Sequence, residues 1–167
     1  MGTTGLVYDP RYLAHDMGAG HPESPNRLRA IMQRLEQSGT LATLTRIDPR
    51  TAEDEWVTLV HRSEYVAMLN RQAPTHGRVS LDGDTSMSPG SLGAAYLAAG
   101  GALAGVDAIM AGRVRHAFCA VRPPGHHAEA DRAMGFCLFN NVAIAARYAQ
   151  KRYGVQRVLI VDWDVHH

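Results

Sequence analysis

The sequence predicts an α/β fold built on a mainly parallel sheet. Segments with strand character alternate along the chain with longer segments that carry a helical pattern of apolar residues. A chain of 167 residues has the length of one domain and can bury a substantial core. The last apolar run, residues 158–161, leads directly into Asp162, Asp164 and His166. Open α/β sheets place their functional sites at such carboxyl ends of strands.

The first half of the chain predicts two strands and two helices. The first helix is indicated by apolar residues at the spacing i, i+3, i+4 and i+7 and by a glycine suited to its end. In chain order we expect a strand at residues 4–8, a helix from 24–26 to Gly39, a strand at 44–47 and a helix at 53–70.

The second half begins with a loop, residues 73–91, which is rich in Pro, Gly, Ser and Asp. The helix expected next is rich in Ala and Gly, so it should be covered on several sides. We expect this helix at 92–110, a buried strand at 117–121, a loop at 122–135, a helix at 140–153 closed by Gly154, and a buried last strand at 157–163.

Composition excludes several functional classes. The formal net charge of +1 gives no argument for nucleic acid or an anionic membrane as a partner. No uninterrupted apolar run reaches the roughly 18 residues of a membrane span, and the N-terminus lacks the pattern of a signal peptide. Two cysteines are too few for a disulfide framework, so we expect a cytoplasmic protein.

Two clusters contain the residue types that metal binding and acid–base chemistry need. Asp162, Asp164 and His166 alternate, so in an extended backbone they share one face and suit a zinc site with an open position. A solvated strand end is the alternative, and spacing alone leaves both open. His126 and His127 follow a loop start that is fixed by Pro and Gly residues. Two positioned imidazoles suit acid–base catalysis near neutral pH, and an ordinary surface loop is the alternative.

Three further segments are ambiguous. Residues 134–137 (MGFC) close the same loop, and their aromatic residue belongs either to the core or to a substrate wall. Residues 21–27 (HPESPNR) read as ordinary helix-start chemistry. Residues 81–85 (LDGDT) suit either a cation or cationic substrate, or a turn followed by an N-cap, and local evidence favours the turn.

Taken together, these segments resemble the zinc-dependent histone deacetylase family within the arginase/deacetylase fold. The stretches RPPGHHAEADRAMGFCLFNN, RVLIVDWDVHH, HPESPNRL and DGDTSMSPGS are similar to the class II branch and its bacterial amidohydrolase relatives. The resemblance implies a three-layer α/β/α fold that is incomplete in this chain. Its first three strands should pair with one another, and the strand at 157–163 should lie apart from them.

The resemblance also implies roles for individual residues. Asp164 and His166 match two of three zinc ligands, and Asp162 matches the carboxylate that orients His126 and helps hold a structural potassium ion. His127 matches the general base and later acid, and His126 an electrostatic partner. The remaining matches are Gly135 and Phe136 in the substrate channel, Arg27 near the acetate cavity, and Asp82 or Asp84 at the substrate rim.

The implied function is a deacylase that uses zinc, with iron(II) as the alternative metal. Its expected substrates are an acylated lysine in a peptide or protein, or an acetylated small amine as in acetylpolyamine amidohydrolases. A binuclear arginase-like hydrolase shares the fold, but the PPGHH segment speaks against it. The family's third metal ligand and its catalytic tyrosine find no match here. We therefore expect residues 1–167 to be the N-terminal portion of one deacetylase domain, inactive in isolation, or else a non-catalytic, partner-binding remnant.

Overall fold

A parallel three-stranded sheet lies at the centre of the molecule in the computed structural model, which describes residues 3–166. Its strands are β1 (Thr4–Val7), β2 (Thr45–Ile47) and β5 (His116–Cys119), in the order β2-β1-β5. Val7 lies opposite Ile47 on one side and Cys119 on the other, and both pairings are parallel. This confirms the predicted α/β class and the pairing of the first three strands.

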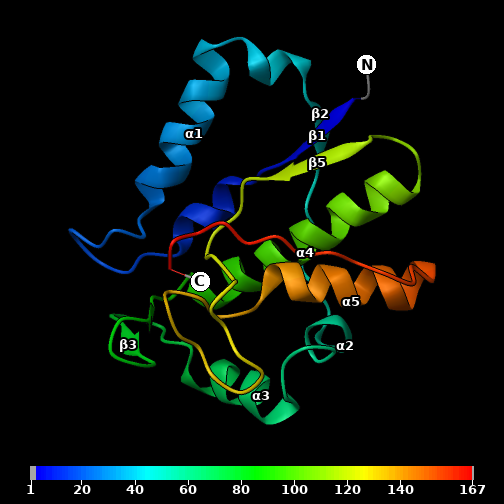
Figure 1. Ribbon diagram of the computed structural model, residues 1–167. Helices are drawn as coiled ribbons and strands as arrows, with labels where there is room; N and C mark the ends of the chain where they lie inside the picture. The colour runs from blue at the N-terminus through cyan, green and yellow to red at the C-terminus, as the bar shows by residue number, and fades with distance from the viewer. Residues whose placement is uncertain (1–2, 167) are drawn as a thin grey trace.

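Helices cover both faces of this sheet, because successive strand residues point to opposite sides. Leu6 packs with Leu28 of α1 (Pro25–Gln37), while Val7 packs with Ala104 of α4 (Ser91–Met110). Figure 1 shows α1 and α4 on opposite sides of the strands, with α5 (Asn141–Tyr153) packed against α4. The sheet therefore lies between two helical layers, as expected.

Helix α4 is the central helix of the core. Its 20 residues are long and apolar enough to cross a membrane by length and composition, but 67% of its most apolar window is buried inside the fold. A Cβ atom added to Gly100 would lie 1.8 Å from the carbonyl oxygen of Arg50, so the neighbouring loop approaches the helix backbone directly. Close packing on several sides compensates for the weak helix propensity of its glycines.

The single helix expected at 53–70 is wrong: α2 (Asp54–Val57) and α3 (Ser63–Gln72) are separate. Between them, the ring of His61 bonds the carbonyl oxygen of Glu129 at 2.7 Å through Nδ1 and accepts the amide of Asn140 at 2.9 Å through Nε2. The amide of Arg62 bonds the carbonyl of Ala130 at 2.7 Å. These tertiary hydrogen bonds replace helical ones and anchor both ends of residues 129–140.

Other expectations differ in detail. The expected loop at 73–91 contains a small antiparallel pair, β3 (Val79–Ser80) and β4 (Ser86–Met87), and two 3-10 turns were not foreseen, η1 (Pro10–Ala14) and η2 (Thr40–Thr43). The strand expected at 117–121 is β5 (His116–Cys119), and it is not fully buried, since Phe118 is 42% exposed.

The buried strand expected at 157–163 does not form in the described structure. This segment runs back towards the N-terminal end of α5 (red in Figure 1) with no strand partner among residues 3–166. Leu159 is 86% and Trp163 91% exposed. A strand needs a neighbour for its backbone groups, and an apolar pattern alone does not supply one. The segment does lie apart from the first three strands, as the resemblance implied.

A buried ion pair joins the start of the 122–135 loop to the segment before α1. Arg122 donates from Nε to Oε1 of Glu23 at 2.6 Å and from Nη2 to Oε2 at 2.5 Å, and both side chains are almost fully buried. Nη1 of Arg122 donates to the carbonyl of Tyr12 in η1 at 3.0 Å. Nε2 of His15 lies 3.4 Å from Oε2 of Glu23. Burial opposes ionisation of Glu23, but the bonds from His15 and Arg122 outweigh it and lower its pKa to about 2.

We predict that Glu23→Gln lowers the free energy of unfolding by about 3–5 kcal/mol, because it leaves a buried guanidinium without its counter-charge. Urea denaturation at pH 7 measures the change. The double variant Glu23→Leu/Arg122→Met removes both charges and should be markedly less destabilised. Asp48→Asn, which breaks the exposed pair of Arg46 and Asp48, should cost no more than about 1 kcal/mol. Equal losses in Glu23→Gln and the double variant would contradict the prediction.

We also predict acid sensitivity from His61, whose pKa is lowered by burial. A group with a depressed folded pKa contributes stability above its unfolded pKa, about 6.5, and that stability is lost as pH falls through the folded value. Protonation would also place an N–H on Nε2, facing the amide of Asn140. Urea midpoints measured from pH 7.5 to 5 should fall more steeply for the unsubstituted chain than for His61→Asn. The exposed His76→Asn should keep the original slope; a slope unchanged in His61→Asn would contradict the assignment.

Candidate metallohydrolase site

One pocket of about 480 Å³ brings together most of the residues singled out in the sequence. Its wall is built from four separate parts of the chain: the start of α1 with the segment before it, the 81–85 segment, the loop between β5 and α5, and the C-terminal segment. The lining residues with predicted roles are Arg27, Asp84, His126, His127, Gly135, Phe136, Asp164 and His166. Arg27 and His166, which are 139 positions apart in the sequence, therefore line one cavity, whereas His167 lies outside the described residues.

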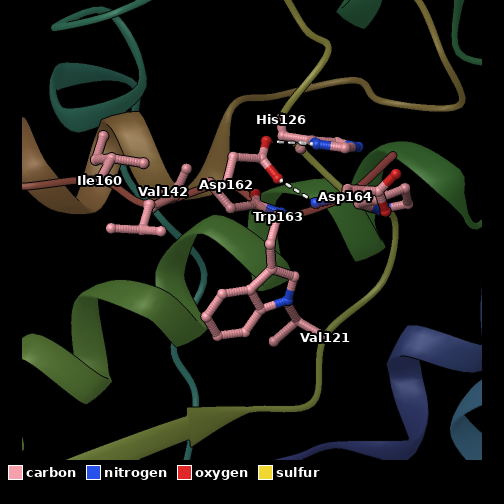
Figure 2. A pocket seen from close by; sticks show the side chains of 11 residues that line it. Val121, His126, Val142, Ile160, Asp162, Trp163 and Asp164 are labelled. Atoms are coloured by element: carbon pink, nitrogen blue, oxygen red, sulfur yellow. Dashed lines mark hydrogen bonds and ion pairs between the residues drawn. The ribbon is translucent and has the colours of Figure 1, made fainter. Parts of the chain in front are cut away.

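The imidazole of His126 is held by Asp162. Their Nδ1 and Oδ2 atoms lie 2.8 Å apart, and Figure 2 shows the carboxylate facing the ring. Two hydrogen bonds lower the pKa of Asp162. The larger effect comes from the ring of His126 and the smaller one from the amide of Asp164. An ionised carboxylate only accepts hydrogen bonds, so Nδ1 carries the proton, and in the neutral ring Nε2 keeps its lone pair. The ring of His127 lies beside it, with centroids 4.1 Å apart.

The polypeptide around the two histidines is fixed at both ends. Arg122, bound to Glu23, begins the segment, and the Arg122–Pro123 peptide bond is cis. At the other end Asn140 caps α5 by accepting the amide of Ala143 at 3.1 Å, while its Nδ2 lies 3.3 Å from the carbonyl of Ala128. The histidines thus sit on a loop that has little regular structure but is anchored on both sides.

Asp164 and His166 are paired at the mouth of this pocket. Oδ1 of Asp164 lies 3.1 Å from Nδ1 of His166 and accepts its amide at 2.9 Å, and these bonds lower the pKa of Asp164. Tetrahedral zinc ligands at about 2.0–2.1 Å from the metal stand about 3.3 Å apart, so this pair fits two corners of a zinc site. Residues 3–166 contain no group of three or more His, Cys, Asp or Glu arranged to hold a metal. Asp164 and His166 therefore match only part of the ligand set of a zinc site.

Gly135 and Phe136 form the pocket wall opposite the C-terminal segment. A Cβ atom on Gly135 would lie 2.4 Å from Cδ2 of His127, so the glycine backbone lies directly against that ring. The ring of Phe136 meets the edge of His21, with centroids 4.7 Å apart and planes at 82°. The aromatic residue of the MGFC segment is therefore part of a cavity wall.

The two aspartates proposed for the rim lie in one local turn. Oδ1 of Asp82 accepts the amides of Asp84 and Thr85, at 2.9 and 2.8 Å, and so closes that turn. Asp84 lines the pocket that holds both histidines, and both aspartates line a neighbouring pocket with His127 and His166. Arg27 also lines that pocket, with its Nη1 3.9 Å from Oε1 of Glu23.

Several supporting residues had no assigned function in the sequence. Glu23 and Arg122 lie within the recognised motifs HPE and RPPGHH, but their pairing spans 99 positions. The partners of His61 and Thr85 have no local signal, because each side chain bonds a residue more than 50 positions away. Such partners follow from the fold and not from spacing.

A second pocket, of about 460 Å³, lies behind Asp162. It is lined by Val121, Asn141, Val142, Ile160 and Trp163 among others, and Figure 2 shows the indole of Trp163 extending towards Val121. Oδ1 of Asn141 is buried here without a hydrogen-bond partner.

Comparison with known proteins places this geometry in context. The chain is 41% identical to Histone deacetylase 5 of Arabidopsis thaliana and 42% identical to Polyamine deacetylase HDAC10 of Homo sapiens, over 98% of its own length in each case. It is 43% identical, over 89% of its length, to Histone deacetylase-like amidohydrolase of Pseudomonas aeruginosa. The crystal structure of the HDA15 HD domain superposes on the whole chain with a TM-score of 0.93 and 40% identity.

The matched region is part of a larger unit in these relatives. The chain spans 26% of the plant and human proteins, 39% of the bacterial one, and 48% of the HDA15 chain. The match to the histone deacetylase domain covers residues 21–167, which is most of the sequence. On these grounds the protein belongs to the histone deacetylase family.

Proposed function

We propose that this chain supplies the tandem-histidine half of a zinc-dependent deacylase site that cleaves an acyl group from an amine. One observation carries the proposal: the Nδ1–Oδ2 contact of 2.8 Å between His126 and Asp162, beside a pocket that also contains His127, Asp164 and His166. Membership of a family whose relatives include named deacetylases and an amidohydrolase supports it.

Amide hydrolysis needs a base that takes a proton from water and an acid that returns one to the amine. His127 is placed for both steps, because its ring lies in the pocket against the backbone of Gly135. His126 lies beside it and is oriented by the carboxylate of Asp162.

Asp164 and His166 would hold the zinc ion, which supplies Lewis-acid polarisation of the amide carbonyl and of water. Iron(II) has similar ligand preferences and remains the second candidate metal. The potassium role proposed for Asp162 rests on family resemblance. Because the described residues supply two ligands, we propose that the complete site requires polypeptide beyond them and that residues 1–167 alone are inactive.

The substrate class we propose is an acylated lysine side chain, whose methylene stem suits a wall made by Phe136 and Gly135. Arg27 would line the cavity for the released acid, and Asp82 or Asp84 would be the rim carboxylate, because both line a pocket with His127. Acetylated polyamines are the alternative, favoured by the 42% identity to a relative named a polyamine deacetylase.

The test is a chimera in which this chain replaces the matching segment of the Pseudomonas amidohydrolase. We predict hydrolysis of an acetyl-lysine peptide that a chelator abolishes and added zinc restores. His127→Ala should lower kcat by about 10²–10⁴-fold through loss of the base. Acetylspermidine assayed in parallel separates the two substrate classes.

The exposed His76→Asn is the matched control and should keep full activity. A folded chimera that hydrolyses neither substrate, or one that His127→Ala leaves active, would contradict the proposal. The 167-residue chain alone should show no hydrolysis with zinc present.

A further inference from the structure

The turn that forms the pocket wall has a strained backbone. Met134 and Cys137 exchange two backbone hydrogen bonds, of 3.2 and 2.9 Å, across Gly135 and Phe136. Both central residues have positive φ, 55° and 68°, a conformation that favours glycine and is disfavoured for a bulky aromatic residue. Within residues 3–166, Phe136 is the one non-glycine residue with positive φ. A contact outside the turn must therefore stabilise it.

That contact is the hydroxyl of Thr85. The amide of Phe136 donates to Oγ1 of Thr85 at 3.0 Å, and this amide has no acceptor within its own turn. Oγ1 in turn donates to Oδ1 of Asp84 at 2.9 Å. Thr85 is fully buried, and its amide is fixed by Oδ1 of Asp82 at 2.8 Å. The 81–85 segment is thus a closed turn that presents one hydroxyl to Phe136.

Two consequences follow for the pocket. With the positive φ of Phe136 its ring meets the ring of His21 edge-on, while the preceding Gly135 lies against the ring of His127. Release of the Phe136 amide would let the turn relax and would move both contacts together. The same hydroxyl also orients Asp84, so the rim and the wall share one hydrogen-bonded support.

We propose that Thr85 is a positioning residue, whose hydroxyl holds Phe136 in its left-handed conformation and thereby fixes the substrate wall beside His127. The assignment of Phe136 to a substrate wall rests on the proposed function; the role of Thr85 in holding the turn does not.

Amide hydrogen exchange, followed by NMR on the 167-residue chain, tests the role in the turn. In the unsubstituted chain the Phe136 amide should exchange at least about tenfold more slowly than the Gly135 amide, because it has a buried acceptor. Thr85→Val removes the hydroxyl at nearly constant volume and should remove that protection, together with the nuclear Overhauser contact between Phe136 and His21. Thr85→Ser keeps the hydroxyl and should restore both.

Thr58→Val is the matched control, since it deletes the hydroxyl that bonds the carbonyl of Asp54, far from the turn in sequence, and should leave Phe136 protected. An unprotected Phe136 amide in the unsubstituted chain would overturn the proposal even if Thr85→Val failed to fold. Protection of the Phe136 amide that survives in Thr85→Val would also overturn it. So would a Thr85→Ser variant in which that amide exchanges as fast as in Thr85→Val.

Kinetics in the chimera test the consequence for substrate. Thr85→Val should raise KM for the acetyl-lysine peptide by a larger factor than it lowers kcat, and Thr85→Ser should reverse the effect. A fall in kcat at unchanged KM in Thr85→Val would overturn the role of Thr85 in the substrate wall. An inactive chimera with the expected exchange pattern would refute the deacylase function and leave the positioning of the turn standing.

Discussion

The ion pair between Glu23 and Arg122 is the contact on which the site depends most. It ties the segment before α1 to the first residue of the tandem-histidine loop, and a third bond from Arg122 fixes η1 through Tyr12. Arginine suits this position because the N–H groups of its planar guanidinium donate to a carboxylate and to a carbonyl at the same time. Arg122 thereby joins η1, the segment before α1 and the loop that carries His126 and His127.

The remaining supports act on the same loop from other directions. His61 and Asn140 fix its far end, Asp162 fixes the ring of His126, and Thr85 fixes the turn at Phe136. The bonds made by His61 and Thr85 are part-buried, whereas the bond between His126 and Asp162 is exposed, and each fixes a specific geometry. A loop with little regular structure is in this way held at several points.

The sequence was sufficient to predict the parallel strands and helices α1, α4 and α5, because apolar periodicity and end signals such as Gly39 and Gly154 are local. It could not predict the break between α2 and α3, which exists because His61 bonds residues 68 and 79 positions further along. The apolar run at 157–163 predicted a buried strand, yet pairing depends on neighbours that the described residues do not provide. For the site, motif resemblance grouped the histidines and aspartates, whereas only the fold identified the contact between Thr85 and the amide of Phe136.

We propose that residues 122–127 and 162–166 form one organised half of a metallohydrolase site. The long-range ¹H–¹⁵N NMR correlation of the His126 imidazole in the 167-residue chain tests this proposal most directly. We predict a protonated Nδ1 in a stable hydrogen bond, lost in Asp162→Ala and retained in Asp164→Ala. Averaged nitrogen shifts that are identical in the unsubstituted chain and in Asp162→Ala would contradict it.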